Sequence, residues 1–106
     1  MPDQQIEKRE AGVFGVLGDL SFESVIWVEK EGLDVIKQTD GQMTFDLSSV
    51  GHCSSASLAL LLSWTRAART LDKPLKYTGI PPLLARQIQS AHLQSILPIQ
   101  ASLECD

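Results

Sequence analysis

The chain has 106 residues, of which 43% are apolar and 21% are charged, and its formal net charge is −4. This length and composition are typical of one globular domain with its own core. The acidic balance disfavours nucleic-acid binding, which needs a basic surface. No apolar run approaches the roughly 20 residues of a membrane-spanning helix.

Two cysteines, Cys53 and Cys105, stand far apart, and the first residues, MPDQQIEKRE, contain neither a signal peptide nor a lipidation motif. A disulfide framework is therefore not expected. The expected compartment is the cytoplasm, and association with a membrane complex would occur through a partner protein, without direct membrane insertion.

The N-terminal region is predicted to be a tail followed by a β segment. Residues 1–11 are polar and charged, so we expect a loose tail ahead of a single domain at 12–106. Residues 11–20 (AGVFGVLGDL) favour a bent strand or a short hairpin, with Gly15 and Gly18 permitting a bend or bulge.

A first helix is predicted from residue 22 onward. Ser21 is a favourable N-cap, but residue 24 is serine rather than glutamate, so we expect a cap without the full capping box. The helix is expected to end at Gly32, because glycine commonly follows the last helical residue.

The middle of the chain predicts a strand followed by a long helix. A turn at 40–41 precedes an alternating strand at 43–47, and a second turn is expected at 51–54 (GHCS). A Leu-rich helix is predicted at 55–71 and is stopped before Pro74.

The C-terminal part predicts a strand at 75–80 and a helix at 82–91 that Pro81 and Pro82 open. Residues 95–99 are expected to form a final edge strand or a turn. Strands that alternate with helices imply βαβ crossovers, a small mixed or parallel sheet, and helices on one face of it.

The central helix carries more apolar residues than one buried stripe can hold. On a wheel of about 100° per residue, the side predicted to face the core comprises Leu60, Leu61, Trp64, Ala67, Ala68 and Leu71. The opposite side comprises Ser55, Leu58, Ala59, Leu62, Arg66 and Arg69. The first turns of this helix are therefore apolar on both sides.

Two interpretations of this outer set remain open. Either a neighbouring helix or loop of the same domain covers Leu58 and Leu62, or a partner protein covers them with a polar rim around the contact. Ser54 or Ser55 is expected to cap the helix. A phosphate on Ser55 would be favoured by the helix dipole and the unpaired N–H groups.

No catalytic or cofactor motif stands out. The sequence has no dinucleotide fingerprint, phosphate-binding loop or CxxC pair. His52 and Cys53 are adjacent, but a third metal ligand is not evident, and His92 is about 40 residues away. A nucleophilic pair of Cys53 and a histidine lacks an orienting group. We therefore expect neither an enzyme nor a bound metal or other cofactor.

Four segments together resemble a STAS domain, and more narrowly the MlaB type, also called toluene-tolerance or NTP-binding STAS proteins. These segments are GDLSFESV, TFDLSSV, SSASLALLLSWTRAAR and LKYTGIPPLLARQIQSAHL, and the resemblance covers about residues 12–99. It implies an α/β, SpoIIAA-like STAS fold, with a small mixed sheet and helices packed on one face.

The resemblance also implies a function. MlaB-type proteins are non-enzymatic cytoplasmic subunits of an ABC transporter that moves phospholipid between the two membranes of Gram-negative bacteria, and they dock on its ATPase subunit. Docking centres on the N-terminal end of the central helix, which coincides with the outer apolar set. The implied partner-binding residues are Ser54, Ser55, Leu58, Ala59, Leu62 and Arg66.

The chain departs from the family pattern at the start of this helix. Ser55 matches the residue that is phosphorylated in anti-sigma factor antagonists, but the usual acidic residue before it is Ser54 here. Ser57 replaces a usual glycine, and its wheel angle points it inward. The alternative function is that of an anti-sigma factor antagonist. In that case Ser55 is the candidate phospho-acceptor, and an anti-sigma kinase would switch the protein by phosphorylating it. A nucleotide-binding STAS regulator is the third.

Overall fold

The structure is a computed structural model that describes residues 5–99. The elements in chain order are β1 (Ile6–Glu10), β2 (Val13–Val16), β3 (Gly18–Leu20), α1 (Phe22–Gln38), β4 (Met43–Asp46), β5 (Val50–Cys53), α2 (Ala56–Thr70), β6 (Leu75–Thr78) and α3 (Pro82–Ser90).

The main sheet has four strands in the order β1-β2-β4-β6. β1 pairs with β2 antiparallel, whereas β2 with β4 and β4 with β6 pair in parallel. The parallel strands are joined through α1 and α2, as expected for βαβ crossovers. The predicted mixed sheet is therefore confirmed.

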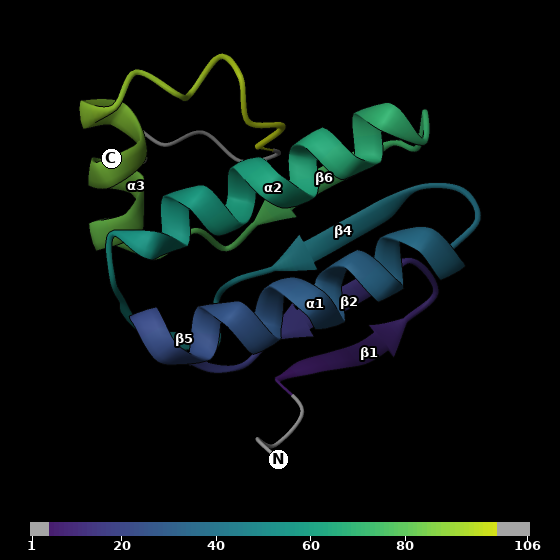
Figure 1. Ribbon diagram of the computed structural model, residues 1–106, viewed down its shortest axis with the longest axis horizontal. Helices are drawn as coiled ribbons and strands as arrows, with labels where there is room; N and C mark the ends of the chain where they lie inside the picture. The colour runs from purple at the N-terminus through teal and green to yellow at the C-terminus, as the bar shows by residue number, and fades with distance from the viewer. Residues whose placement is uncertain (1–4, 100–106) are drawn as a thin grey trace.

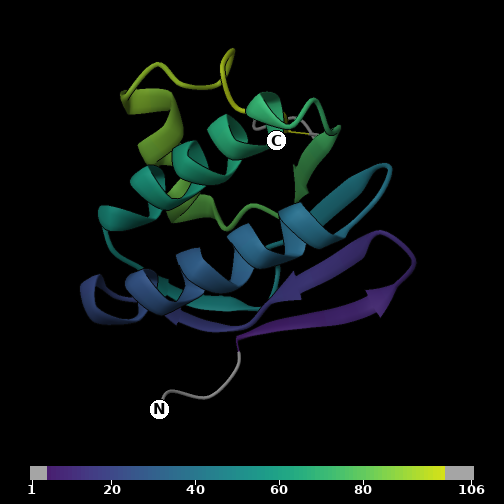
Figure 2. The same ribbon diagram turned by 45° about the vertical axis from the view of Figure 1, so that its right-hand side comes forward.

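Helices α1 and α2 run side by side in the same direction over one face of this sheet, and α3 lies beside the N-terminal half of α2 (Figures 1 and 2). The core between the two layers is partly aromatic. The Phe45 ring stacks on Trp64 with 4.5 Å between centroids and lies 6.3 Å from Tyr77. The predicted placement of helices on one face is confirmed.

The expected polar tail is wrong for residues 6–10, which form the edge strand β1. Ile6 is only 3% exposed and packs in the core, while the other side chains of this strand are exposed. A strand at a sheet edge buries few side chains, so a segment with a single apolar residue is sufficient. Residues 1–4 lie outside the described range.

Two predictions for the first helix are wrong. α1 continues through Gly32 to Gln38. Gly32 does not end the helix but is a packing position, since a side chain there would collide with the Trp64 ring. A capping box is also present. The Ser24 backbone N–H donates to Ser21 Oγ at 3.1 Å, and the Ser21 N–H donates to Ser24 Oγ at 2.9 Å. Serine therefore replaces glutamate in the box.

The turn predicted at 51–54 is also wrong in part, because Val50–Cys53 is strand β5. β5 pairs in parallel with β3 in a separate two-stranded sheet. The other elements lie where they were predicted, with ends shifted by a few residues. At 95–99 the structure has turns and one parallel bridge between Ile99 and Tyr77.

The sheet face away from the helices carries an ion-paired cluster. The Arg9 side chain lies over Gly15 and pairs with the carboxylates of Glu7 and Asp46. Burial favours a higher pKa for Asp46, but hydrogen bonds from Ser48 and the charge of Arg9 outweigh it and hold that pKa below its ordinary value.

Candidate functional site: the outer surface of helices α1 and α2

Among the described residues, the Ser55 hydroxyl at the start of α2 has no hydrogen-bond partner. Ser54 performs the capping, since its Oγ accepts a hydrogen bond from the Ala56 N–H at 3.2 Å. Ser55 occupies the N-cap position, yet its side chain makes no capping bond and is exposed. The expected N-cap position is therefore Ser55, but the side-chain bond at this end of the helix comes from Ser54. Ser57 is fully buried, as its wheel angle predicts.

The predicted core stripe of α2 is correct except at its end. Leu60, Leu61, Trp64 and Ala68 are buried, and Ala67 is partly buried. Leu71, however, is 44% exposed. It is the C-cap residue that follows the last helical residue, where the chain leaves α2.

The predicted partner-binding residues do not all face the same way. Along α2, positions four apart rotate by about 40° at each step, because 3.6 residues complete a turn. Leu58 accordingly faces α3, whereas Arg66 faces α1. Ala59 and Arg66 are exposed, and Leu58 and Leu62 are partly buried against the core.

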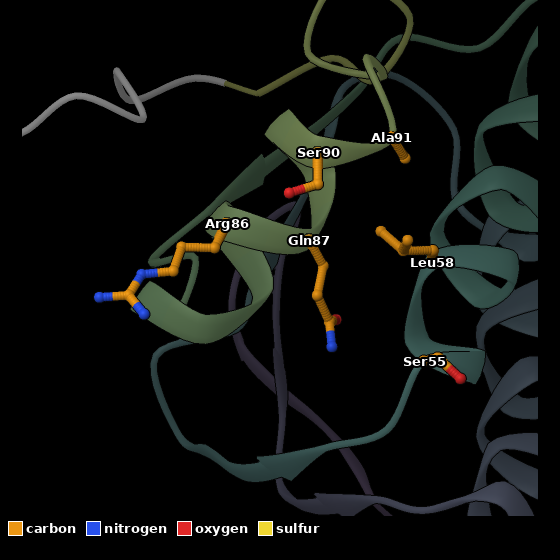
Figure 3. Close-up of a pocket in the computed structure, with 6 residues that line it drawn as sticks. All are labelled: Ser55, Leu58, Arg86, Gln87, Ser90 and Ala91. Atoms are coloured by element: carbon orange, nitrogen blue, oxygen red, sulfur yellow. The ribbon is translucent and has the colours of Figure 1, made fainter.

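A hollow of about 380 Å³ separates the N-terminal end of α2 from α3. Its lining comprises Ser55, Leu58, Arg86, Gln87, Ser90 and Ala91. Figure 3 shows the Gln87 side chain pointing into this space and Arg86 pointing away from α2. Leu58 packs partly against the core and shares this hollow with α3, so a helix of the same domain lies beside Leu58 without fully covering it.

Three large apolar side chains of α1 are exposed, those of Phe22, Ile26 and Trp27, and none of them was among the predicted site residues. Phe22 is 66% exposed and Ile26 is 57% exposed. The Ser63 hydroxyl donates to the Glu29 carboxylate at 2.6 Å, which places position 29 of α1 beside position 63 of α2. Ile26 and Ala59 lie one turn earlier on their helices, and Phe22 lies about one turn before Ile26.

We call the four residues Phe22, Ile26, Ala59 and Leu62 the α1/α2 face. The sequence did carry a signal for its α1 part, since residues 22–36 also contain more apolar side chains than one stripe holds. A surface that combines exposed aromatic and aliphatic side chains on two rigid helices is suited to protein contact rather than to chemistry.

The residues considered for metal binding or nucleophilic catalysis are not brought together. Cys53 is buried and free, and burial raises the pKa of its thiol. His52 lies in β5 and His92 follows the end of α3. Within residues 5–99, no group of three His, Cys, Asp or Glu residues is arranged to hold a metal ion. Cys105 lies outside the described residues.

The family model described as "Mlab, STAS domain" matches residues 4–98. The chain belongs to the MlaB-type STAS domain family. The resemblance seen in the sequence is thereby confirmed, and the matched range includes β1. None of the curated proteins compared with the chain matches it. Among the described residues, no helix is long and apolar enough to cross a membrane.

Solved structures of two kinds share this fold. A chain of the Acinetobacter MlaFEDB complex in one ATP-bound conformation is 27% identical with a TM-score of 0.71, over 87% of this chain and 97% of that one. A chain of the same complex in a second ATP-bound conformation is 29% identical with a TM-score of 0.69, over 83% of this chain and 93% of that one. The anti-sigma factor antagonist SpoIIAA in its unphosphorylated form is 16% identical with a TM-score of 0.71, over 94% of this chain and 88% of that one. The SpoIIAA-like STAS fold is therefore confirmed.

Proposed function

We propose that this protein is a non-enzymatic STAS subunit of an ABC-type intermembrane phospholipid transport complex, where it binds and supports the ATPase subunit. The observation that carries the proposal is membership of the MlaB-type family, together with 27% identity to a chain of the MlaFEDB complex over nearly all of that chain. In this role it would be cytoplasmic and peripheral on the inner membrane, held there by the complex.

The geometry of the α1/α2 face supports a docking role. Its apolar side chains come from two helices that are packed on the same sheet face and tied by the bond between Glu29 and Ser63. A rigid face of this kind loses little conformational entropy when a partner binds. Ser55 and Arg66 lie at opposite ends of the α2 part of this face and supply polar groups at its rim.

Co-purification with the cognate ATPase subunit tests this proposal. Leu62→Asp places a charge on the face, and Ala59→Arg adds bulk there without removing a core side chain, so each variant should lose the ATPase subunit. Leu83→Asp is the matched control, because Leu83 is an exposed leucine of α3 outside the face. If both variants retain the ATPase subunit while melting like the wild type, docking through this face is wrong.

A second candidate is an anti-sigma factor antagonist that phosphorylation at Ser55 would switch. The observation that favours it is the exposed Ser55 hydroxyl, which the helix cap leaves unused. A phosphate there would also interact favourably with the N-terminal end of α2. Incubation with a cognate anti-sigma kinase and ATP should then add one phosphate to the wild type and none to Ser55→Ala, as intact mass reports. No added mass on the wild type removes this candidate.

A further inference from the structure

A groove of about 380 Å³ lies in the seam between the C-terminal halves of α1 and α2. Leu33 from α1 and Ala67 and Leu71 at the end of α2 supply its apolar surface. The small side chain of Ala67 leaves space between the helices. Ligand pockets usually have volumes of about 300–1,000 Å³, so this groove is at the low end of that range. It suits one or two inserted side chains better than a buried cofactor.

Two cations border this apolar surface, Lys37 on α1 and Arg66 on α2. Both are exposed, and neither forms an ion pair with any residue in the described part of the chain, where the ion pairs all involve Arg9. The nearby Glu29 carboxylate already accepts the Ser63 hydroxyl. The two charges are therefore available to a partner.

Lys37 is not needed to stabilise the end of its own helix. The Lys73 ammonium donates to the carbonyl oxygens of Ile36 and Lys37 at 2.8 and 2.9 Å, and these are among the last carbonyls of α1. Lys73 thus provides the cation that usually interacts with a helix C-terminus. The Lys37 side chain remains beside the groove, with no hydrogen-bond or ion-pair partner among residues 5–99.

We propose that this groove, which we call the seam groove, binds an acidic amphipathic segment of the partner protein. One or two apolar side chains of that segment insert between Leu33, Ala67 and Leu71, and carboxylates beside them pair with Lys37 and Arg66. An anionic membrane surface fits less well, because lipid binding of this kind draws on clusters of about 4–8 basic residues. Only two cations, Lys37 and Arg66, line this groove, and the chain as a whole has a net charge of −4.

The seam groove adjoins the α1/α2 face through Arg66, so the inference rests on the proposed function and adds a second, charge-dependent contact with the same ATPase subunit. Its test uses residues outside the α1/α2 face. Lys37→Glu reverses a groove charge, and Leu71→Ser removes an exposed apolar side chain. Lys76→Glu is the matched control, since Lys76 is exposed on β6, whose apolar side faces the core.

Affinity for the cognate ATPase subunit is measured at about 0.1 M and about 1 M salt, between which the Debye length falls from about 10 Å to about 3 Å. We expect Lys37→Glu to weaken binding about tenfold at low salt and much less at high salt. Leu71→Ser should weaken it severalfold at both salt concentrations, and Lys76→Glu should bind like the wild type. Thermal melting confirms that each variant is folded.

The outcomes separate the two proposals. If Leu62→Asp loses the ATPase subunit but Lys37→Glu and Leu71→Ser bind like the wild type, the seam groove is wrong and the docking role stands. If all three bind like the wild type, docking through the α1/α2 face is wrong as well. Binding to phosphatidylglycerol vesicles that Lys37→Glu abolishes would overturn the protein segment as the occupant.

Discussion

Gly32 lies against the indole ring of Trp64, and this contact sets the distance between α1 and α2. A Cβ at position 32 would collide with the ring, far inside van der Waals contact. The Trp64 side chain is fully buried, stacks on Phe45 and donates its Nε1–H to the Glu29 carbonyl at 3.1 Å. The ring therefore has no room to shift, and glycine is required at this helical position.

Gly32→Ala should lower the free energy of unfolding by about 2 kcal/mol. Alanine favours a helix over glycine by about 1 kcal/mol, but overpacking a buried ring costs about 1–3 kcal/mol and backbone displacement adds to it. Urea unfolding measures the change. Combining the substitution with Trp64→Leu should cost less than the sum of the two single changes. An increase in stability would contradict this packing.

Asp46 makes stability depend on pH, because its carboxylate is held by Arg9 and by the Ser48 N–H at 2.9 Å. Its pKa is lower in the folded protein, so its contribution is present above the ordinary value of 3.8 and is lost as the pH falls toward the folded value.

Asp46→Asn should lower the free energy of unfolding by about 1 kcal/mol at neutral pH. The difference from the wild type should shrink as the pH falls below about 4, since the wild-type carboxylate is then protonated. Urea unfolding at neutral and acidic pH provides the measurement. A difference of the same size at both pH values would show that Asp46 does not act through its charge.

Strand β1 shows how an element with few apolar residues still belongs to the fold. Four of its five residues are exposed, and it joins the sheet through its backbone bonds to β2 and through Ile6. Backbone pairing depends on the neighbouring strand rather than on side-chain type. The charged segment IEKRE therefore carries no strand pattern in its own sequence, and its strand forms by pairing with β2.

Ile6→Ala should lower the free energy of unfolding by about 2–4 kcal/mol, as for other large-to-small changes in a core. A loose tail would show no change. Lys8→Ala, on the same strand but exposed, should stay within about 0.5 kcal/mol of the wild type. Urea unfolding of both variants distinguishes a structural strand from a tail.

The whole molecule is asymmetric in polarity. One sheet face is covered by α1 and α2, and the outer surface of those helices again presents apolar side chains, Phe22 and Ile26 among them. Because these side chains contribute little to the core, they are expected to contribute to association rather than to folding.

Replacing Phe22 and Ile26 together by glutamine should separate binding from stability. Glutamine is a good helix former, so we expect the free energy of unfolding to change by less than about 1 kcal/mol. Affinity for the cognate ATPase subunit should fall at least about tenfold. The control replaces Leu83 and Ile96, two exposed apolar residues elsewhere, by glutamine. Equal losses in both double variants would contradict a specific face.

Periodic segments of the sequence predicted their elements well. The helix at 55–71 corresponds to α2, and the alternating strands at 43–47 and 75–80 correspond to β4 and β6. Predictions failed where a distant residue determines the local structure. Trp64 explains why a glycine stands inside α1, and β3 explains why residues 50–53 are a strand.

The candidate site was also predictable only in part, because some of its features are local to one helix and others depend on packing between elements. The wheel identified the outward side of α2, because the angle between residues is fixed by the helix itself. It could not indicate that Leu58 lines a hollow with α3, that Ser54 rather than Ser55 accepts the Ala56 N–H, or that Glu29 of α1 lies beside Ser63 of α2. These facts depend on how separate elements pack.

By itself, the sequence determined the fold class, the family and the two-sided polarity of the central helix, because hydrophobic periodicity and local motifs are properties of contiguous residues. Only the tertiary structure decided where β1 and β5 pair, where α1 ends, and which exposed residues of α1 and α2 lie together. Those features arise from contacts between segments far apart in the chain, and local preferences of under about 1 kcal/mol per residue are too small to oppose them.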